Sequence, residues 1–263
     1  MRKDRRAPPL DRRRHLKQLL AAGGALAVSG CDRLSESPRF NAALDSAEGW
    51  TYTVQRLLLG RDALAQEYPA ADISPHPRSN GSSTPGTDEY NRLASNGFRD
   101  WRLAVSGLVE RPQSLSLEDL RQLPSRAQIT RHDCVEGWSY IAQWKGARLA
   151  ALLARAGLRP EARYIAFFCA DTLEMTLDGT GRYYETIDLR DAMHAQTILA
   201  YEMNDRPLPI PYGAPLRLRL ERQLGYKMAK YIVRIEAIAS FERIGRGKGG
   251  FWEDRGYQWY AGI

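Results

Sequence analysis

Hydrophobic and polar positions follow two different patterns along this chain, and the change falls near Trp101. Residues 32–100 show little periodicity and are rich in proline, glycine, serine and asparagine, which mark turns and loops. Only residues 43–59 predict a helix in this part. A stretch this long without regular structure is uncommon in a compact domain unless it wraps a ligand or the surface.

From Trp101 onward the pattern is that of many short strands and a few short helices. The predicted strands are residues 101–107, 126–131, 164–169, 183–187, 197–201, 216–220 and 231–241. The predicted helices are residues 116–120, 149–156 (closed by Gly157) and 189–193. These elements do not alternate as strand–helix–strand units, so the sequence predicts an α+β fold built on mixed sheets.

The first 31 residues are typical of an export signal. The segment 11–17, Asp-Arg-Arg-Arg-His-Leu-Lys, resembles the twin-arginine consensus, and the apolar run 19–28 is too short to span a bilayer as a stable helix. The run ends in Val28-Ser29-Gly30-Cys31, which resembles a lipoprotein cleavage box. The alternative is a plain basic N-terminus. We therefore expect a signal over 1–31, an N-terminal extension over 32–70 and one domain over 71–263.

Most of the formal net positive charge lies in the predicted export signal. The formal net charge is +7 and the isoelectric point is about 9.4, yet residues 1–31 hold eight Lys or Arg and two Asp. The remainder is nearly neutral, so the basic composition does not indicate a nucleic-acid partner. The sequence also lacks a Walker-type phosphate loop, a GxSxG turn, an HExxH motif and paired CxxC motifs.

Cys134 is the residue whose surroundings point most directly to chemistry. It follows an apolar run and precedes a Gly-Trp-Ser turn, and the flanking Arg131 and His132 are expected to favour the thiolate, a soft metal ligand. Two alternatives stay open. A lone cysteine is often a small buried hydrophobe, and Cys134 and Cys169 form a disulfide in an oxidising compartment if they lie close together.

Four segments in order resemble the sulfite oxidase superfamily of molybdopterin enzymes. The first is Cys134–Ser139 followed by Trp144-Lys145-Gly146. The others are residues 199–217, which include Leu199–Asn204 and Gly213–Arg217, then Gly225–Tyr231, and finally Gly250–Tyr257. The resemblance runs from about Ala71 to the C-terminus. It is greatest to the bacterial single-domain members, which include a periplasmic methionine-sulfoxide reductase.

The resemblance implies a site for a molybdenum–molybdopterin cofactor. In the family one cysteine sulfur binds molybdenum beside the pterin dithiolene, and Cys134 matches that position, with Arg131 and Trp138 around it. The pterin carries a phosphate, so a basic cradle is expected, although without the motif a solvated basic strand face would explain the same cations. The positions implied to bind the cofactor are Asn80, Gly81, Arg131, His132, Cys169, Tyr212, Arg217, Lys227, Met228, Ala229 and Lys230.

Several positions depart from the family or leave a choice open. Tyr212 stands where the reductase has asparagine and sulfite oxidase has histidine, and Cys169 stands where the reductase has threonine. Arg78 belongs to a short segment resembling the start of the family's active-site loop and is expected to bind an oxyanion. Tyr183 and Tyr184 lie near the position of the sulfite oxidase active-site tyrosine. Neighbouring residues of a strand point to opposite faces, so at most one of the two faces the metal.

The function expected from the resemblance is oxygen-atom or two-electron transfer at a molybdenum held by Cys134, on a small-molecule or sulfoxide-type substrate. The alternatives are a sulfite dehydrogenase and, outside the enzymes, a lipid-anchored binding or scaffold protein that has lost the metal. No haem motif occurs in the sequence, so electrons are expected to come from a separate partner such as a membrane cytochrome b. We expect a monomer in the periplasm, held at the inner membrane by lipid on Cys31.

Overall fold

The computed structural model describes residues 37–176 and 181–263, and the chain divides into two units, residues 1–55 and 56–263. The described part of the first unit consists of most of helix α2 (Pro38–Leu58), which begins earlier than the predicted 43–59. Proline suits the first helical turn, where a backbone N–H would be unpaired anyway. Within the described residues no helix has the length and apolar character needed to cross a membrane. The predicted signal, residues 1–31, lies outside the described residues.

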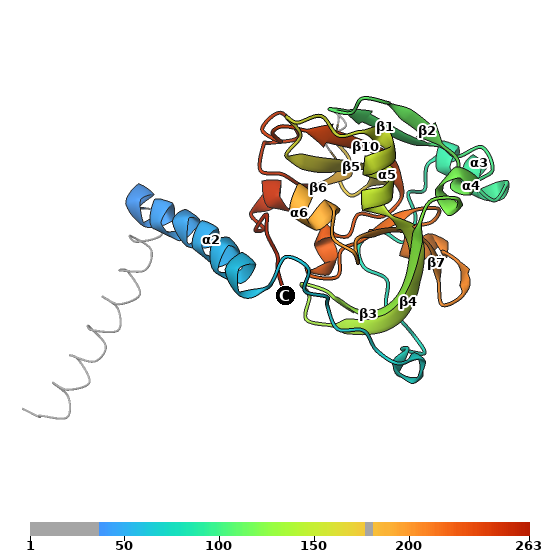
Figure 1. Ribbon diagram of the computed structural model, residues 1–263, viewed down its shortest axis with the longest axis horizontal. Helices are drawn as coiled ribbons and strands as arrows, with labels where there is room; N and C mark the ends of the chain where they lie inside the picture. Colours follow the sequence, from blue (N-terminus) through green and yellow to red (C-terminus); the bar gives the residue numbers. More distant parts are fainter. Residues whose placement is uncertain (1–36, 177–180) are drawn as a thin grey trace, which may run out of the picture. The chain divides into compact units, whose positions relative to one another are not determined.

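The second unit is built on two five-stranded sheets (Figure 1). The first has the order β2-β1-β10-β5-β6 and is mixed, because β1 and β10 run parallel while the other pairs are antiparallel. Its strands are β1 (Leu103–Gly107), β2 (Gln113–Leu115), β5 (Tyr164–Thr172), β6 (Arg182–Asp188) and β10 (Ile232–Ile238). The second sheet has the order β3-β4-β7-β8, and β9 also pairs with β7. Its strands are β3 (Ser125–Asp133), β4 (Ser139–Arg148), β7 (Ile198–Met203), β8 (Arg206–Pro207) and β9 (Arg217–Arg219).

Short helices and turns connect these strands. The α-helices of the second unit are α3 (Asp88–Ser95), α4 (Leu117–Arg121), α5 (Leu149–Ala156) and α6 (Leu189–Ala192). The 3₁₀ turns are η1 (Ala70–Asp72), η2 (Ile210–Tyr212), η3 (Gly225–Lys227) and η4 (Glu253–Arg255). The α+β fold is confirmed. Helix α5 occupies the predicted residues, and Ser116 forms the capping box of α4.

Apart from the 3₁₀ turns, the sequence patterns missed helix α3 and strands β2, β4 and β8, and they extended several strands too far. Residues 32–100 were expected to be irregular beyond one helix, but α3 lies within them, capped by the Thr87 side chain. Strand β10 ends at Ile238, three residues before the predicted end.

Two hydrophobic cores hold the second unit together. The larger includes Leu152 and Leu153 of α5 with Ile165, Phe167 and Ile235 of the first sheet, each at most 1% exposed. Burying one such side chain contributes about 1.5–3 kcal/mol. The smaller core belongs to the second sheet and comprises Tyr140, Ala142, Trp144, Ile198, Ala200, Met203, Leu208 and Ala214. Because β4 supplies three residues of this core, packing holds the strand that follows the β3–β4 turn in place.

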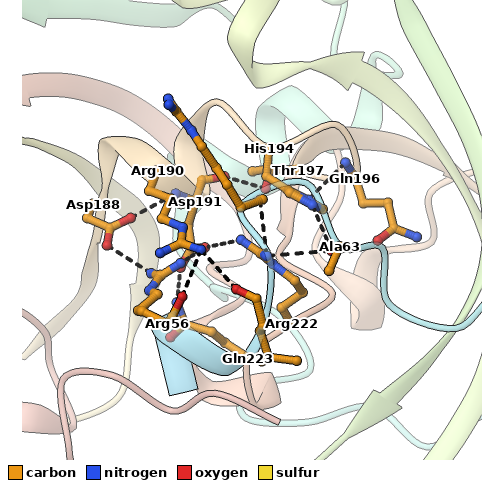
Figure 2. Close-up of polar contacts among 12 residues, drawn as sticks. Arg56, Ala63, Asp188, Arg190, Asp191, His194, Gln196, Thr197, Arg222 and Gln223 are labelled. Carbon is orange, nitrogen blue, oxygen red and sulfur yellow. Dashed lines mark hydrogen bonds and ion pairs between the residues drawn. The ribbon is translucent and has the colours of Figure 1, made fainter. Parts of the chain in front are cut away.

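A buried polar cluster around Asp191 connects α6 to two segments that are distant in the sequence (Figure 2). Arg56 donates to both carboxylate oxygens of Asp191, each at 2.7 Å. Arg222 and Gln223 donate to the same carboxylate at 3.0 and 2.5 Å. Nearby, the His194 ring lies 3.1 Å from the Ala63 carbonyl oxygen. The cluster therefore ties residues 56–63 and 222–223 to α6 and the loop after it.

Candidate active site

Cys134 lies in the turn that joins β3 to β4, at the edge of a pocket of about 140 Å³. Two backbone hydrogen bonds close the turn, from Cys134 N to the Trp138 carbonyl (2.9 Å) and from Gly137 N to the Cys134 carbonyl (3.0 Å). We call this cavity the site pocket. It is lined by Asn80, Gly81, Ser82, Cys134, Val135, Glu136, Asp171, Leu173, Tyr183, Gly225, Tyr226, Met228, Lys230, Trp252 and Tyr257.

The charges beside Cys134 differ from those expected. Arg131 does not line the pocket and pairs with Asp133, with 2.9 Å between Nε and Oδ1, and His132 is fully buried, which lowers its pKa well below the usual value and keeps it neutral. Burial raises the pKa of the Cys134 thiol, and the Glu136 backbone N–H and the charge of Arg78 only partly offset this. The expectation that Arg131 and His132 favour the thiolate is therefore wrong for the protein alone. A bound metal ion would itself favour the thiolate.

Besides Lys227, which two carboxylates bind, three cations of this region are buried: Arg217, Arg219 and Lys230, each at most 5% exposed. Arg219 forms an ion pair with Glu221 at 2.6 Å. Arg217 instead donates to the Tyr212 carbonyl at 3.0 Å, and burial lowers its pKa to about 10. This part of the described interior therefore carries more positive charge than its ion pairs balance, a condition that suits a bound anion.

Lys230 both lines the pocket and holds the loop above it. Its ammonium donates to the carbonyl oxygens of Asn80 (2.6 Å), Ser82 (2.5 Å) and Pro211 (2.9 Å). Burial, followed by the charge of Arg217, lowers the pKa of Lys230 to about 7. The Ser82 hydroxyl in turn donates to Asp171 at 2.6 Å. Lys230 thus fixes the Asn80–Ser82 segment over the site.

His132 presents an unused donor inside the protein. Arg219 Nη1 donates to His132 Nδ1 at 3.0 Å, and since a guanidinium has only donors, Nδ1 must be the acceptor. Burial, with the charges of Arg219, Arg217 and Lys230, lowers the pKa of His132 well below its usual value, so the neutral ring carries its proton on Nε2. That buried Nε2 has no hydrogen-bond partner among the described residues. It lies beside Gly225, where an added Cβ would be 2.4 Å away.

The two adjacent tyrosines of β6 have different surroundings. Tyr183 lines the site pocket, and its hydroxyl contacts the Tyr226 carbonyl. Tyr184 donates to Asp254 and lines a separate cavity together with Cys169. Of the pair, Tyr183 is the one that faces the pocket.

The remaining predicted residues fall into three groups. Asn80, Gly81 and Met228 line the pocket, while Ala229 is buried and its carbonyl accepts from Leu218 N. Arg78 stacks over Trp138 in the turn that holds Cys134, 5.1 Å from Cζ to the ring centroid, and Tyr212 of η2 donates to the carbonyl of the preceding residue, Pro77, at 2.5 Å. Lys227 and Cys169 do not line the pocket. The Lys227 ammonium is bound by Glu185 and Glu253 instead.

Cys134 and Cys169 are both free thiols, so the disulfide alternative is not present in this structure. No group of three or more His, Cys, Asp or Glu side chains among the described residues could hold a metal ion. A metal at Cys134 would therefore need most of its ligands from a non-protein group. One thiol, an unbalanced set of buried cations and an unused His132 donor fit a metal complex that carries a phosphate.

Sequence analysis missed several residues of this region. Arg219 is one of the three buried cations, and Asp171, Gly225, Tyr226 and Trp252 line the pocket. A signal existed for Arg219, because it stands two positions from Arg217 in a predicted strand and so shares its face. Asp171 has no local signal that distinguishes it from an ordinary strand residue, whereas Trp252 lies in the Gly250–Tyr257 segment of the resemblance, which assigned it no role.

The fold is that of a molybdopterin-binding oxidoreductase. Residues 91–243, more than half of the chain, match the family described as the oxidoreductase molybdopterin binding domain. The chain belongs to this family, and it is a molybdenum-dependent oxidoreductase whose cofactor is molybdopterin.

Two related proteins and one solved structure are similar to this chain. The chain is 35% identical over 252 residues to YedZ1 of Azospira oryzae, a protein named for a protein-methionine-sulfoxide reductase subunit, and the match covers 95% of this chain and 87% of that one. It is 32% identical over 232 residues to the protein-methionine-sulfoxide reductase catalytic subunit MsrP of Xanthomonas axonopodis pv. citri, covering 86% and 70%. The sulfane dehydrogenase SoxCD from Paracoccus pantotrophus shares the fold, with a TM-score of 0.51 at 21% identity over 68% of this chain and 46% of that chain.

Proposed function

We propose that this protein is the catalytic subunit of an exported reductase of sulfoxides, with methionine sulfoxide as the substrate class, and that Cys134 supplies the protein's ligand to molybdenum. The observation that carries the proposal is the half-buried Cys134 thiol at a pocket backed by unbalanced buried cations. The names of the relatives, which specify protein-methionine-sulfoxide reductase, support the substrate class.

The residues that would hold the cofactor are Cys134 for the metal and Arg217, Lys230 and His132 for the pterin and its phosphate. When bound, the cofactor supplies two-electron exchange coupled to transfer of an oxygen atom. His132 Nε2 would gain an acceptor it lacks within the described residues. Lys230 would keep the Asn80–Ser82 segment closed over the group through its three bonds to carbonyl oxygens.

The rest of the pocket wall suits a sulfoxide with an aliphatic tail. Val135, Leu173 and Met228 offer apolar contact, and Trp252 stacks on Tyr257 with 5.3 Å between ring centroids. Tyr183 also lines the pocket, and its phenol would hydrogen-bond a polar group there when its hydroxyl turns from the Tyr226 carbonyl. An apolar wall with a few polar groups is the usual character of a small-molecule site.

The source of electrons belongs to the same proposal. We place the protein in the periplasm, with lipid on Cys31 as its anchor and a separate redox partner, a membrane cytochrome b, as its electron donor. The protein acts as a monomer in this scheme. The twin-arginine-like segment 11–17, the segment Val28–Cys31 and the absence of a haem motif from the sequence support it.

The test is dye-driven turnover by protein made in a host that synthesises molybdopterin. The wild type should contain molybdenum and reduce methionine sulfoxide with a reduced viologen. Cys134→Ser should lower turnover by more than about a hundredfold, beyond the usual effect of residues around a metal site, while the protein stays folded. Ser139→Ala, in the same hairpin and exposed, is the matched control and should keep its activity.

Three results would contradict the proposal. Full turnover with bound molybdenum in Cys134→Ser would exclude Cys134 as the ligand. Oxidation of sulfite with a dye acceptor, without sulfoxide reduction, would identify a sulfite dehydrogenase. Wild-type protein free of molybdenum from a competent host would favour the scaffold alternative.

A further inference from the structure

A cluster of three buried charged groups lies directly behind the pocket residue Tyr183. Lys227 Nζ is 2.5 Å from Glu185 Oε1 and 2.5 Å from Glu253 Oε1, and all three side chains are at most 1% exposed. The carboxyl groups converge on Gly250, where an added Cβ would lie 2.1 Å from Glu253 Oε2 and 2.7 Å from Glu185 Oε1. Two carboxylates therefore share one ammonium in a space closed to water.

The charges in this cluster balance only if one carboxyl group is protonated. A buried net charge is costly, and two carboxylates in contact cannot both ionise easily. Burial and the charge of Glu253 raise the pKa of Glu185 well above its usual value, although Lys227 opposes the shift. The pKa of Lys227 is raised by the same two carboxylates against the effect of burial, so the ammonium keeps its charge.

The hydrogen bonds of the Tyr183 hydroxyl also agree with one protonated carboxyl group in this cluster. The Tyr183 hydroxyl has one hydrogen, and it contacts the Tyr226 carbonyl, which can only accept. Tyr183 Oη also lies 3.3 Å from Glu185 Oε2. An ionised Glu185 would compete with the Tyr226 carbonyl for this one hydrogen, whereas a protonated Glu185 would donate to Tyr183 Oη and leave the phenol hydrogen on the carbonyl. Glu253 Oε2, buried and without a hydrogen-bond partner in the described part of the chain, is a free acceptor beside it.

We infer that Glu185 and Glu253 share one stored proton, balanced by Lys227, and that Tyr183 passes this proton into the site pocket. The fate of the proton rests on the proposed function, because reduction of a sulfoxide consumes two protons and two electrons and yields a sulfide and water. The electrons come from the external donor, one proton comes from the carboxyl pair, and the second comes from solvent.

The transfer is balanced at each atom. The Tyr183 hydroxyl turns from the Tyr226 carbonyl toward the pocket, its O–H bond breaks, and a new O–H bond forms on the substrate oxygen that leaves as water; the Glu185 O–H bond then breaks and a new O–H bond forms on Tyr183. Glu185 is left as a carboxylate against Lys227, and the reverse path from pocket water restores its proton. Glu185 therefore acts through Tyr183 as a positioning residue that holds the proton.

The groups that face the store are few among the described residues. Lys227 comes from η3, Glu253 from η4 and Tyr183 from β6 itself, and the Thr186 backbone N–H donates to Glu185 Oε1 at 2.8 Å. Asp171 and Cys169 of β5 act on Tyr183, and both add to the effect of burial and of Glu185 in raising the pKa of its phenol. The Trp259 ring lies 5.4 Å from Lys227 Nζ.

Infrared difference spectra of the purified full-length protein test the store without any reaction. Glu185→Gln keeps the shape of the side chain, can donate to Tyr183 and can accept from Lys227. At neutral pH it should remove the carbonyl band of one protonated carboxylic acid. Glu174→Gln, at an exposed glutamate paired with Arg255, is the matched control and should remove carboxylate bands only. Loss of carboxylate bands alone in Glu185→Gln would overturn the store.

Hydrogen–deuterium exchange of the same band tests the path. After transfer to heavy water, Tyr183→Phe should exchange the Glu185 proton at least about tenfold more slowly than the wild type, because the phenol oxygen is gone while both carboxyl groups remain. Equal exchange rates in the two proteins would refute passage through Tyr183. This variant also serves if Glu185→Gln fails to fold.

Turnover then separates this inference from the proposed function. In dye-driven sulfoxide reduction, Glu185→Gln should lower kcat about tenfold or more with little change in KM, and its rate should fall with rising pH where that of the wild type is flat. An unchanged pH profile would exclude a role for the store in turnover. A wild type that lacks sulfoxide reductase activity but shows the protonated band and Tyr183-dependent exchange would refute the proposed function and leave the store standing.

Discussion

Gly225 is a position at which one added methyl group should alter the cofactor site. An alanine Cβ there would lie 2.4 Å from His132 Nε2 and 3.1 Å from the Asp133 carbonyl oxygen, and the His132 ring is fully buried. We expect Gly225→Ala to lower the free energy of unfolding by about 1–3 kcal/mol, the usual cost of overpacking. Because the His132 imidazole would be displaced, the purified variant should also contain less pterin and less molybdenum.

Chemical denaturation and metal analysis measure the two effects of Gly225→Ala. Gly49→Ala is the control, because the Cβ at that position of helix α2 meets nothing within 4 Å. The control should keep both stability and cofactor. Normal molybdenum content in Gly225→Ala would show that the space beside His132 is not part of the cradle.

At the level of single residues, the sequence predicted side chains whose chemistry is unusual for their local context. Cys134 stood out because a thiol followed an apolar run and preceded a turn, and the structure places it at the pocket. Glu185 and Glu253 could not be found in this way. Each is an ordinary glutamate in its own segment, and only the packing of η4 against β6 brings the two carboxyl groups to one lysine.

At the level of elements, helix α6 depends on one buried carboxylate. Asp191 accepts hydrogen bonds from Arg56, Arg222 and Gln223, and its side chain is 1% exposed (Figure 2). Asp191→Asn would remove the counter-ion of buried Arg222 and one of the two counter-ions of Arg56, which also pairs with Asp188. We expect it to lower the free energy of unfolding by about 3–5 kcal/mol, measured by denaturant titration at neutral pH.

The pH dependence of this effect has a defined sign. Burial raises the pKa of Asp191, but the hydrogen bonds and charges of Arg56, Arg222 and Gln223 outweigh it and hold the pKa below its usual value. A carboxyl group with a lower pKa in the folded state stabilises the protein above its unfolded pKa and loses this effect as the pH falls. The stability difference between wild type and Asp191→Asn should therefore shrink below about pH 4. A difference that stays constant down to pH 2 would contradict this account.

Whether an element was predicted depended on how far its local pattern was interrupted. Helix α5 has three leucines on one face and glycine at its end, so its limits were predictable. Strand β4 alternates buried Tyr140, Ala142 and Trp144 with less buried residues, but one of these is the apolar Ile141, so the sequence shows no regular polar–apolar alternation. Strand β10 stops at Ile238 because the chain leaves the sheet there, which the apolar residues up to Phe241 do not reveal.

At the level of the whole molecule, the site depends on segments far apart in the sequence. The pocket takes residues from the loop before α3, from the β3–β4 turn, from β5 and β6, from η3 and from the C-terminal region. Lys230 ties the loop before α3 to η2 through its bonds to Asn80, Ser82 and Pro211. Such a site assembles only when the chain is folded, which is consistent with a transport route that carries folded proteins.

Export by the twin-arginine route is the prediction at this level. Arg12 and Arg13 form the pair of the consensus-like segment, and the apolar run that follows ends at Cys31. Replacing both with lysine keeps the charge but should trap the precursor in the cytoplasm, as measured by fractionation of cells that express the protein. The trapped form should still contain molybdenum, because the cofactor would enter before export.

The matched control uses another arginine pair in the same leader. Arg5→Lys with Arg6→Lys makes the same chemical change outside the motif and should leave export intact. Since both double variants keep the net charge, a difference between them reports recognition of the motif rather than the basic character of the leader. Equal export of both would argue against the twin-arginine route, and release of the exported protein without detergent would argue against lipid on Cys31.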